Sequence, residues 1–148
     1  MSTTIELEFE THIDLDFVEQ GIAVHLIRLT ASVQLKTEEG WTRKYKALVD
    51  TGNPISLIPN SVWSKCKINW ILPHESDLRG IGGGKVSGKL GEIILVLVDK
   101  KTTSPPIRAK ALLLDDDRVP FLIGFEDVLT DIKLVCDYKG KTSFFEIR

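Results

Sequence analysis

The sequence predicts an all-β protein, and three observations carry this prediction. Apolar residues occupy alternate positions over long stretches, which is the period-two pattern of half-buried strands. Residues 93–98 and 109–114 are mostly apolar without regular alternation, which is typical of strands that are buried on both faces. Helix signals are few and short. Beside the strands we therefore expect one or two short helices.

The first third of the chain alternates in two phases. Alternation over 5–17 predicts strand, and its phase shifts across 19–21, where we expect a turn or a bulge. It resumes over 22–35 and is followed by a polar turn at 38–40. Residues 41–49 then read as another strand, which ends just before an acidic residue.

The rest of the chain continues the pattern. Residues 133–138 and 142–147 flank a Lys-Gly-Lys turn and predict a β-hairpin. Asn60 or Ser61 can cap one or two helical turns, and 126–130 can form another short helix.

Composition limits the class of protein. The chain has 148 residues, of which 43% are hydrophobic and 27% charged, so we expect one globular domain over 1–148 with a core of its own. A net charge of −2 argues against a nucleic-acid partner. The longest aliphatic run, 93–98, is too short to cross a bilayer, and the first residues do not resemble a secretory signal. Cys66 and Cys136 suggest reduced thiols, so we expect a cytoplasmic protein without a membrane partner.

Three segments contain residues typical of metal or phosphate sites, but none of them forms a complete motif. His74-Glu75 begins like a zinc-protease motif, but the second histidine is replaced by Leu78. Residues 83–90 nearly spell a phosphate-binding loop, yet they lack its final hydroxyl and precede a strand. The aspartates at 115–117 are read as a solvated loop. We therefore expect no metal and no other cofactor.

Three blocks of sequence together give a more specific signal for function. An apolar strand runs into Asp50-Thr51-Gly52, and the chain then returns to apolar residues at 55–59. A glycine-rich block follows at 78–86, and a block with Leu122-Ile123-Gly124 follows at 119–129. Asp-Thr-Gly alone is also ordinary turn chemistry. It is the order and spacing of all three blocks that make the signal specific.

Together these blocks resemble the retropepsin family of aspartic proteases, over roughly residues 45–147. The resemblance implies a closed, barrel-like β fold with a flap hairpin. The first 40 residues lie outside it and are expected to add strands at the N-terminus.

The resemblance also implies roles for individual residues. Asp50 would be the catalytic acid and base, with Thr51 and Gly52 supporting the active-site loop. Residues of the flap would close over a bound peptide, and two isoleucines would line pockets for its side chains. The flap residues are Gly80, Ile81, Gly82 and Gly83, and the pocket residues are Ile55 and Ile123.

Proteases of this family cleave peptide bonds with two aspartates that share a proton and activate a water molecule between them. One chain with a single Asp-Thr-Gly supplies only one such carboxylate, and the chain is too short for a second lobe. The resemblance therefore implies a homodimer with Asp50 of each subunit at the two-fold axis. The expected activity is hydrolysis of peptide bonds, between apolar residues, in a peptide or protein substrate.

Some positions depart from the family pattern. Asn53 follows the glycine where Ala or Ser is common, and Pro54 and Phe125 replace an acid–arginine pair that braces many viral dimers. The alternative reading is therefore a catalytically inactive retropepsin-fold module that dimerises or binds peptides. A third reading is an unrelated β-barrel in which Asp-Thr-Gly occurs by chance.

Overall fold

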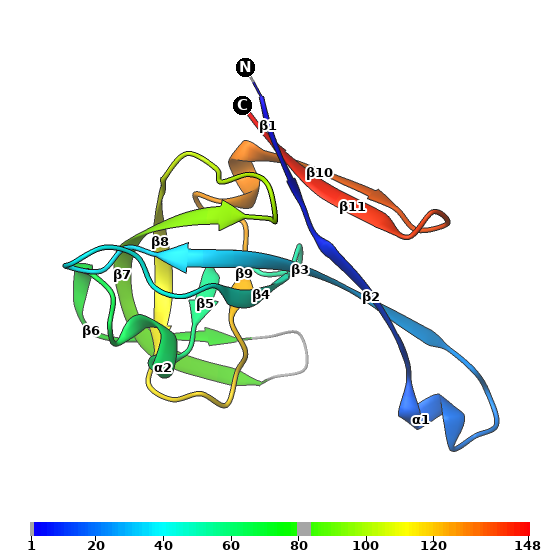
Figure 1. The fold of residues 1–148 in the computed structure, drawn as a ribbon. Helices are drawn as coiled ribbons and strands as arrows, with labels where there is room; N and C mark the ends of the chain where they lie inside the picture. The colour runs from blue at the N-terminus through cyan, green and yellow to red at the C-terminus, as the bar shows by residue number, and fades with distance from the viewer. Residues whose placement is uncertain (1, 80–83) are drawn as a thin grey trace.

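The computed structural model describes residues 2–79 and 84–148 and is mostly β, which confirms the fold class expected from the alternation (Figure 1). The strands are β1 (Thr3–Glu6), β2 (Glu8–Ile13), β3 (His25–Leu35), β4 (Tyr45–Val49), β5 (Ser56–Ile58), β6 (Asn69–Arg79), β7 (Lys85–Val98), β8 (Ile107–Leu114), β9 (Leu122–Ile123), β10 (Ile132–Asp137) and β11 (Thr142–Ile147). The helices are α1 (Leu15–Val18), α2 (Asn60–Trp63) and a 3-10 turn over Leu129–Asp131.

The described strands form two sheets. A three-stranded sheet has the order β1-β11-β10 and joins the two ends of the chain, with Thr3 opposite Ile147. An eight-stranded sheet has the order β2-β3-β4-β9-β5-β8-β7-β6. Because β3 also pairs with β7, six of its strands close into a ring: β3, β4, β9, β5, β8 and β7.

Apolar side chains of the ring strands fill the core, where they meet residues of the smaller sheet and of the segment after β9. Ile5 and Phe145 of the smaller sheet are fully buried against Val33, Leu97 and Ile123 of the ring. Burial of large apolar side chains is the main force that stabilises such a fold. The predicted strands at 93–98 and 109–114 lie within β7 and β8 and are buried except at Ile94 and Lys110, which are half-buried.

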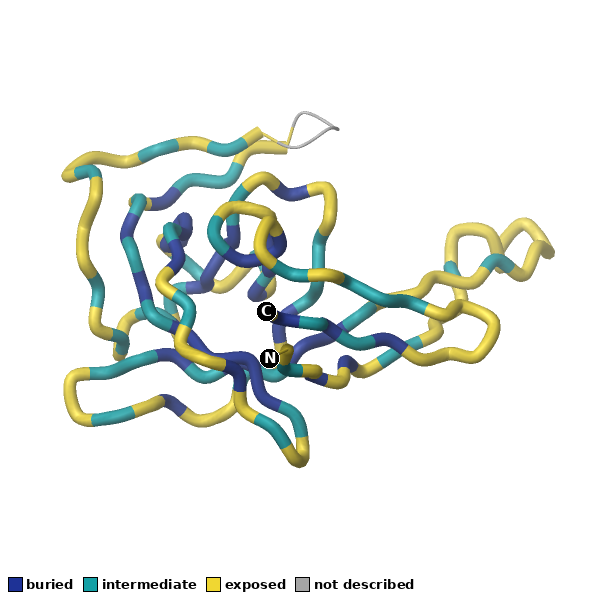
Figure 2. Tube along the Cα trace, turned by 90° about the horizontal axis from the view of Figure 1, so that it is seen from above, coloured by how far each residue is buried: buried dark blue, intermediate teal, exposed yellow. Residues whose placement is uncertain are grey.

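One part of the chain extends away from this body. Strand β2 and the first residues of β3 form a two-stranded projection with α1 at its tip (Figures 1 and 2). We call residues 10–28 the arm. From residue 11 to residue 28 no position is buried, whereas the body in Figure 2 holds the buried residues of the ring.

The secondary structure of the arm differs from the prediction at one place. Alternation predicted strand through Phe17, but Leu15–Val18 is a helical turn. The side chain of Asp14 caps it by accepting a hydrogen bond from the Asp16 N–H, at 3.0 Å. Strand β2 ends at Ile13, so the residues that follow have no neighbouring strand with which to form hydrogen bonds. The helical turn instead satisfies their backbone N–H and C=O groups locally.

Other strands and helices differ in detail from the predicted ones. The strand expected over 41–49 begins only at Tyr45. Ahead of it the hydroxyl of Thr42 accepts the Leu35 N–H, so a side chain replaces part of the ladder. Pro59, rather than Asn60 or Ser61, stands at the cap position of α2. The helix expected over 126–130 is only the 3-10 turn, while the C-terminal hairpin is confirmed.

In residues 2–79 and 84–148, no helix has the length and apolarity needed to cross a membrane. Cys66 and Cys136 are both unpaired and half-buried. Burial raises the pKa of the Cys66 thiol to about 11, so this thiol stays protonated at neutral pH.

Candidate active site

Asp50 stands where β4 ends, in a loop organised around β9. Strand β9 lies between β4 and β5: Val49 pairs with Ile123 in parallel, and Leu57 pairs with Leu122 in antiparallel orientation. The chain therefore leaves β4, crosses the end of β9 and returns on its other side as β5. Residues 50–55, which we call the Asp50 loop, form this crossing.

Short hydrogen bonds tie the Asp50 loop to the segment that follows β9. The Asp50 N–H donates to the Ile123 carbonyl at 2.9 Å, and the Phe125 N–H donates to the Asn53 carbonyl at 2.9 Å. The buried hydroxyl of Ser56 accepts the Gly124 N–H at 3.0 Å. A Cβ on Gly124 would lie 2.5 Å from the Ile55 carbonyl oxygen, so only glycine permits this approach. These contacts hold the loop firmly.

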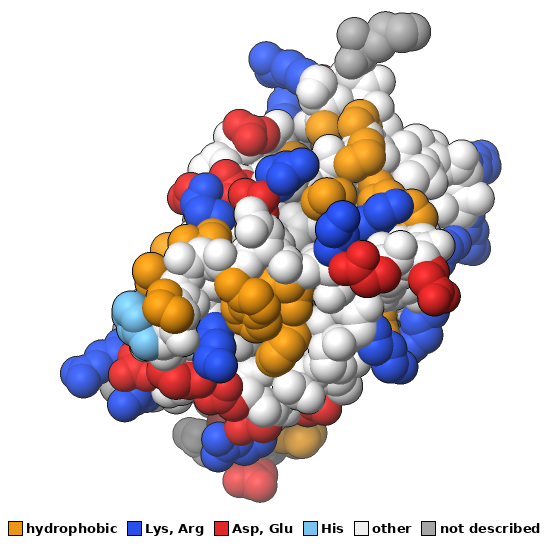
Figure 3. Space-filling model, turned by 90° about the vertical axis from the view of Figure 1, so that its left-hand side faces the viewer, with side chains coloured by type: hydrophobic (Ala, Val, Ile, Leu, Met, Phe, Trp, Pro, Cys, Tyr) orange, Lys and Arg blue, Asp and Glu red, His pale blue; other side chains and the backbone are white. Residues whose placement is uncertain are grey.

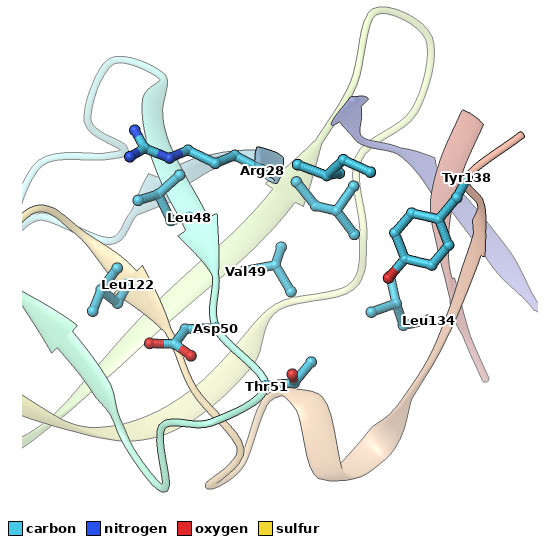
Figure 4. A pocket seen from close by; sticks show the side chains of 10 residues that line it. Arg28, Leu48, Val49, Asp50, Thr51, Leu122, Leu134 and Tyr138 are labelled. Carbon is cyan, nitrogen blue, oxygen red and sulfur yellow. The ribbon is translucent and has the colours of Figure 1, made fainter. Parts of the chain in front are cut away.

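Asp50 is half-buried and lines a cavity of about 290 Å³, with its carboxylate pointing toward Leu122 (Figure 4). One oxygen, Oδ1, accepts the Gly52 N–H at 3.0 Å. The cavity walls come from β3, from β4 and the Asp50 loop, from β9, and from β10 with the residue after it. The lining residues are Ile27, Arg28, Leu29, Leu48, Val49, Asp50, Thr51, Leu122, Leu134 and Tyr138.

Most of this wall is apolar. In Figure 4, Leu122 lies beside Asp50, while Leu134 and Tyr138 face Val49 and Thr51 across the cavity. Arg28 also lines the cavity, and its positively charged group lies beside Leu48 in Figure 4. A side-chain hydrogen bond with Cys136 raises the pKa of Tyr138, so the phenol is neutral at physiological pH. An apolar wall with a few polar groups is typical of ligand sites.

The other residues singled out in the sequence are distributed around this loop. Thr51 lines the cavity and is exposed, and Gly52 is exposed next to it. Among the described residues, the nearest atom to a Cβ on Gly52 would be Asp50 Oδ1 at 3.4 Å, so no described backbone atom crowds the position. Ile123 is fully buried in the main core and does not line the cavity.

Ile55 is also outside the cavity wall and belongs to a second, smaller apolar cluster. It packs half-buried beside the buried side chains of Leu57, Leu112 and Leu114. Leu78 and Val86, from β6 and β7, are half-buried in the same cluster. The expected flap residues Gly80, Ile81, Gly82 and Gly83 lie outside the described residues. The strands that lead to them pair in antiparallel orientation up to Arg79 and Lys85.

The sequence did not reveal most of the cavity wall. Leu48 and Val49 precede Asp50 directly in the sequence, so the sequence alone places them near it. Arg28, Leu134 and Tyr138 join the wall only because β3 and β10 flank the end of β4 in space. No local pattern marks these three residues.

The positions that depart from the family pattern have structural roles. Asn53 is buried, and its side-chain oxygen accepts the Ile55 N–H at 3.4 Å. The Pro54 carbonyl accepts the Glu126 N–H at 2.9 Å. Phe125 stays 40% exposed. The two positions that replace the charged pair thus lie in segments joined by backbone hydrogen bonds.

Metal ligands do not gather in the described part of the chain: it holds no group of three or more His, Cys, Asp or Glu side chains arranged to bind an ion. Within the described wall of the cavity, Asp50 is the only acid. The arrangement therefore presents one carboxylate at the edge of a largely apolar cavity.

Comparison with known proteins does not add a family to this picture. No family model matches the chain, and no curated protein matches its sequence.

Proposed function

We propose that the chain is a homodimeric aspartic endopeptidase of the retropepsin type, in which each subunit supplies one Asp50. The observation that carries the proposal is the Asp50 loop itself. It follows a ring strand, crosses the end of β9, and presents its carboxylate half-exposed at a cavity. The ring of strands around it suits the closed, barrel-like fold that this family uses.

Hydrolysis would need a second carboxylate beside the first. Two carboxylates at about 3 Å cannot both ionise, so one retains a proton. The ionised member takes a proton from a water molecule, and the protonated member donates to the carbonyl oxygen of the peptide. Since the described cavity wall holds no acid other than Asp50, the partner carboxylate would be Asp50 of a second copy.

The rest of the loop supports this arrangement. Thr51 is exposed beside Asp50, where its hydroxyl can bond across a two-fold axis. In residues 2–79 and 84–148 no backbone atom crowds a Cβ at Gly52, which leaves room beside the loop for an approaching peptide backbone. The hydrogen bonds around Asn53 fix the loop before substrate arrives.

Peptide side chains would have an apolar environment. Ile55, Leu78, Val86 and Leu122 are half-buried around the second cluster, between the loop and the strands that lead to residues 80–83. An extended peptide at this edge would place apolar side chains against them. We therefore expect cleavage between apolar residues. The unpaired thiols suit a reducing compartment, and we place the enzyme in the cytoplasm.

The test is cleavage of a diverse peptide mixture, read by mass spectrometry at high protein concentration and at pH values from acid to neutral. We expect cuts between apolar residues that fall by about a thousandfold or more in Asp50→Asn, because one catalytic carboxylate is lost from each subunit. The variant is a matched control, since asparagine can still accept the Gly52 N–H and keep the loop intact.

The alternative is a non-catalytic module with the same fold, which dimerises or binds peptides. A folded wild-type dimer that cuts no peptide at any pH would favour that alternative. Cuts that persist unchanged in Asp50→Asn would show that another group, or a contaminating protease, performs the reaction.

A further inference from the structure

The arm carries an unusual set of exposed side chains. Seven large apolar residues lie along it, with between 40% and 74% of each accessible to solvent. They are Ile13, Leu15, Phe17, Val18, Ile22, Leu26 and Ile27. No residue of α1 is buried. The arm therefore has an apolar surface that the described part of its own chain leaves open.

These side chains lie on both faces of the arm, because Leu26 and Ile27 are consecutive in β3 and point to opposite sides. Seven half-exposed side chains of this kind present on the order of 600 Å², and a standard interface buries about 800 Å² on each partner. Large exposed apolar patches on soluble proteins mark interaction sites. The face turned away from the arm differs, because its hydrophobic side chains lie in small groups between charged ones (Figure 3).

The arm is continuous with the Asp50 site. Ile27, Arg28 and Leu29, at its base, line the same cavity as Asp50 and Thr51 (Figure 4). A second copy that brings its own Asp50 to this cavity must therefore approach the arm. This places a particular partner, a second copy of the chain, next to the exposed apolar surface.

Charge points to the same partner. The arm carries four acidic residues, Glu10, Asp14, Asp16 and Glu19, and a single lysine or arginine, Arg28 at its base. The β10–β11 turn carries Lys139 and Lys141, and that hairpin forms the opposite side of the Asp50 cavity. Two acidic arms would repel each other, whereas each copy of the chain also offers a basic turn.

We propose that the arm of each subunit packs against the body of the second copy and holds together the dimer that completes the Asp50 site. The position of the partner rests on the proposed function. The exposure of the arm and its charge are independent of that function.

The experiment measures dimer dissociation of the full chain by sedimentation over a wide concentration range. Leu15→Ser combined with Phe17→Ser should raise the dissociation constant at least tenfold, because each lost apolar contact occurs twice in a symmetric dimer. Ile71→Ser removes from β6 an aliphatic side chain that is as exposed as Phe17, and should leave the constant unchanged. Circular dichroism confirms that each variant is folded.

A second measurement does not depend on affinity. A photoreactive phenylalanine analogue in place of Phe17 should form a covalent dimer on illumination, with the crosslink mapped to the body of the other subunit. A wild-type chain that stays monomeric, an arm variant that dimerises as tightly as wild type, or crosslinks confined to one chain would overturn the inference.

The inference and the proposed function fail in different ways. An arm-dependent dimer that cuts no peptide overturns the peptidase and leaves the arm contact standing. Peptide cleavage that depends on Asp50, from a dimer insensitive to the arm variants, overturns the arm contact and leaves the peptidase standing.

Discussion

The Asp50 loop and the arm meet at one cavity but are held by different forces. Backbone hydrogen bonds to the segment after β9, and the core beneath it, hold the loop. The arm beyond residue 10 is held mainly by the pairing of β2 with β3, and its apolar side chains stay exposed. The loop is thus ordered by its own chain, whereas the described part of the chain leaves the apolar side chains of the arm exposed.

The largest contrast is expected between two phenylalanines. Phe145 is fully buried in the core, and Phe17 in the arm is 42% exposed. Phe145→Ala should lower the free energy of unfolding by about 3–5 kcal/mol. Phe17→Ala should change it by less than about 0.5 kcal/mol when measured at concentrations low enough to keep the chain monomeric. Chemical denaturation gives both values, and similar losses would mean that the arm folds back onto the body.

A smaller contrast concerns two glycines of the site. Gly124→Ala should destabilise the fold by about 1–3 kcal/mol, because its Cβ would collide with the Ile55 and Asn53 carbonyls. Gly52→Ala should leave the melting temperature nearly unchanged, since no backbone atom in the described part of the chain lies near its Cβ. Under the proposed function, Gly52→Ala should nevertheless reduce peptide cleavage. Thermal melting and the cleavage assay together check this separation of stability from activity.

The smallest expected effect depends on pH and lies at the end of β1, ahead of the arm. Asp99 accepts N–H groups of Glu6, Lys101 and Thr102 at 2.7–2.9 Å. Burial acts to raise the pKa of Asp99, but these three hydrogen bonds outweigh it and leave the pKa lowered. The ionised carboxylate therefore stabilises the fold above the pKa of the unfolded state, near pH 4, and this contribution is lost as pH falls through the lower folded pKa.

Asp99→Asn should accordingly cost about 1–2 kcal/mol of stability at pH 7. The difference from wild type should shrink as the pH falls below about 4. Denaturation curves for both proteins between pH 2 and pH 7 measure it, and a difference that stays constant over this range would contradict the role of the charge.

Local patterns in the sequence predicted much of the fold. Alternation and branched runs predicted the strands, because side chains on a strand point to opposite faces in turn. The same reasoning failed at Leu15–Val18, where alternation continues but no strand is formed. There the cap from Asp14 and the end of the β2 ladder decide the conformation. A period is evidence for a strand only where a neighbouring strand is available to pair.

The sequence by itself determined that the chain is mostly β, and it placed Asp50 at the end of a strand, since both follow from neighbouring residues. Only the tertiary structure decided that β9 lies between β4 and β5, that Arg28 and Tyr138 share a wall with Asp50, and that the arm stays exposed. These features depend on contacts between residues far apart in the chain. Such contacts form because strands bury apolar surface and pair their backbones, and no local pattern specifies which partners meet.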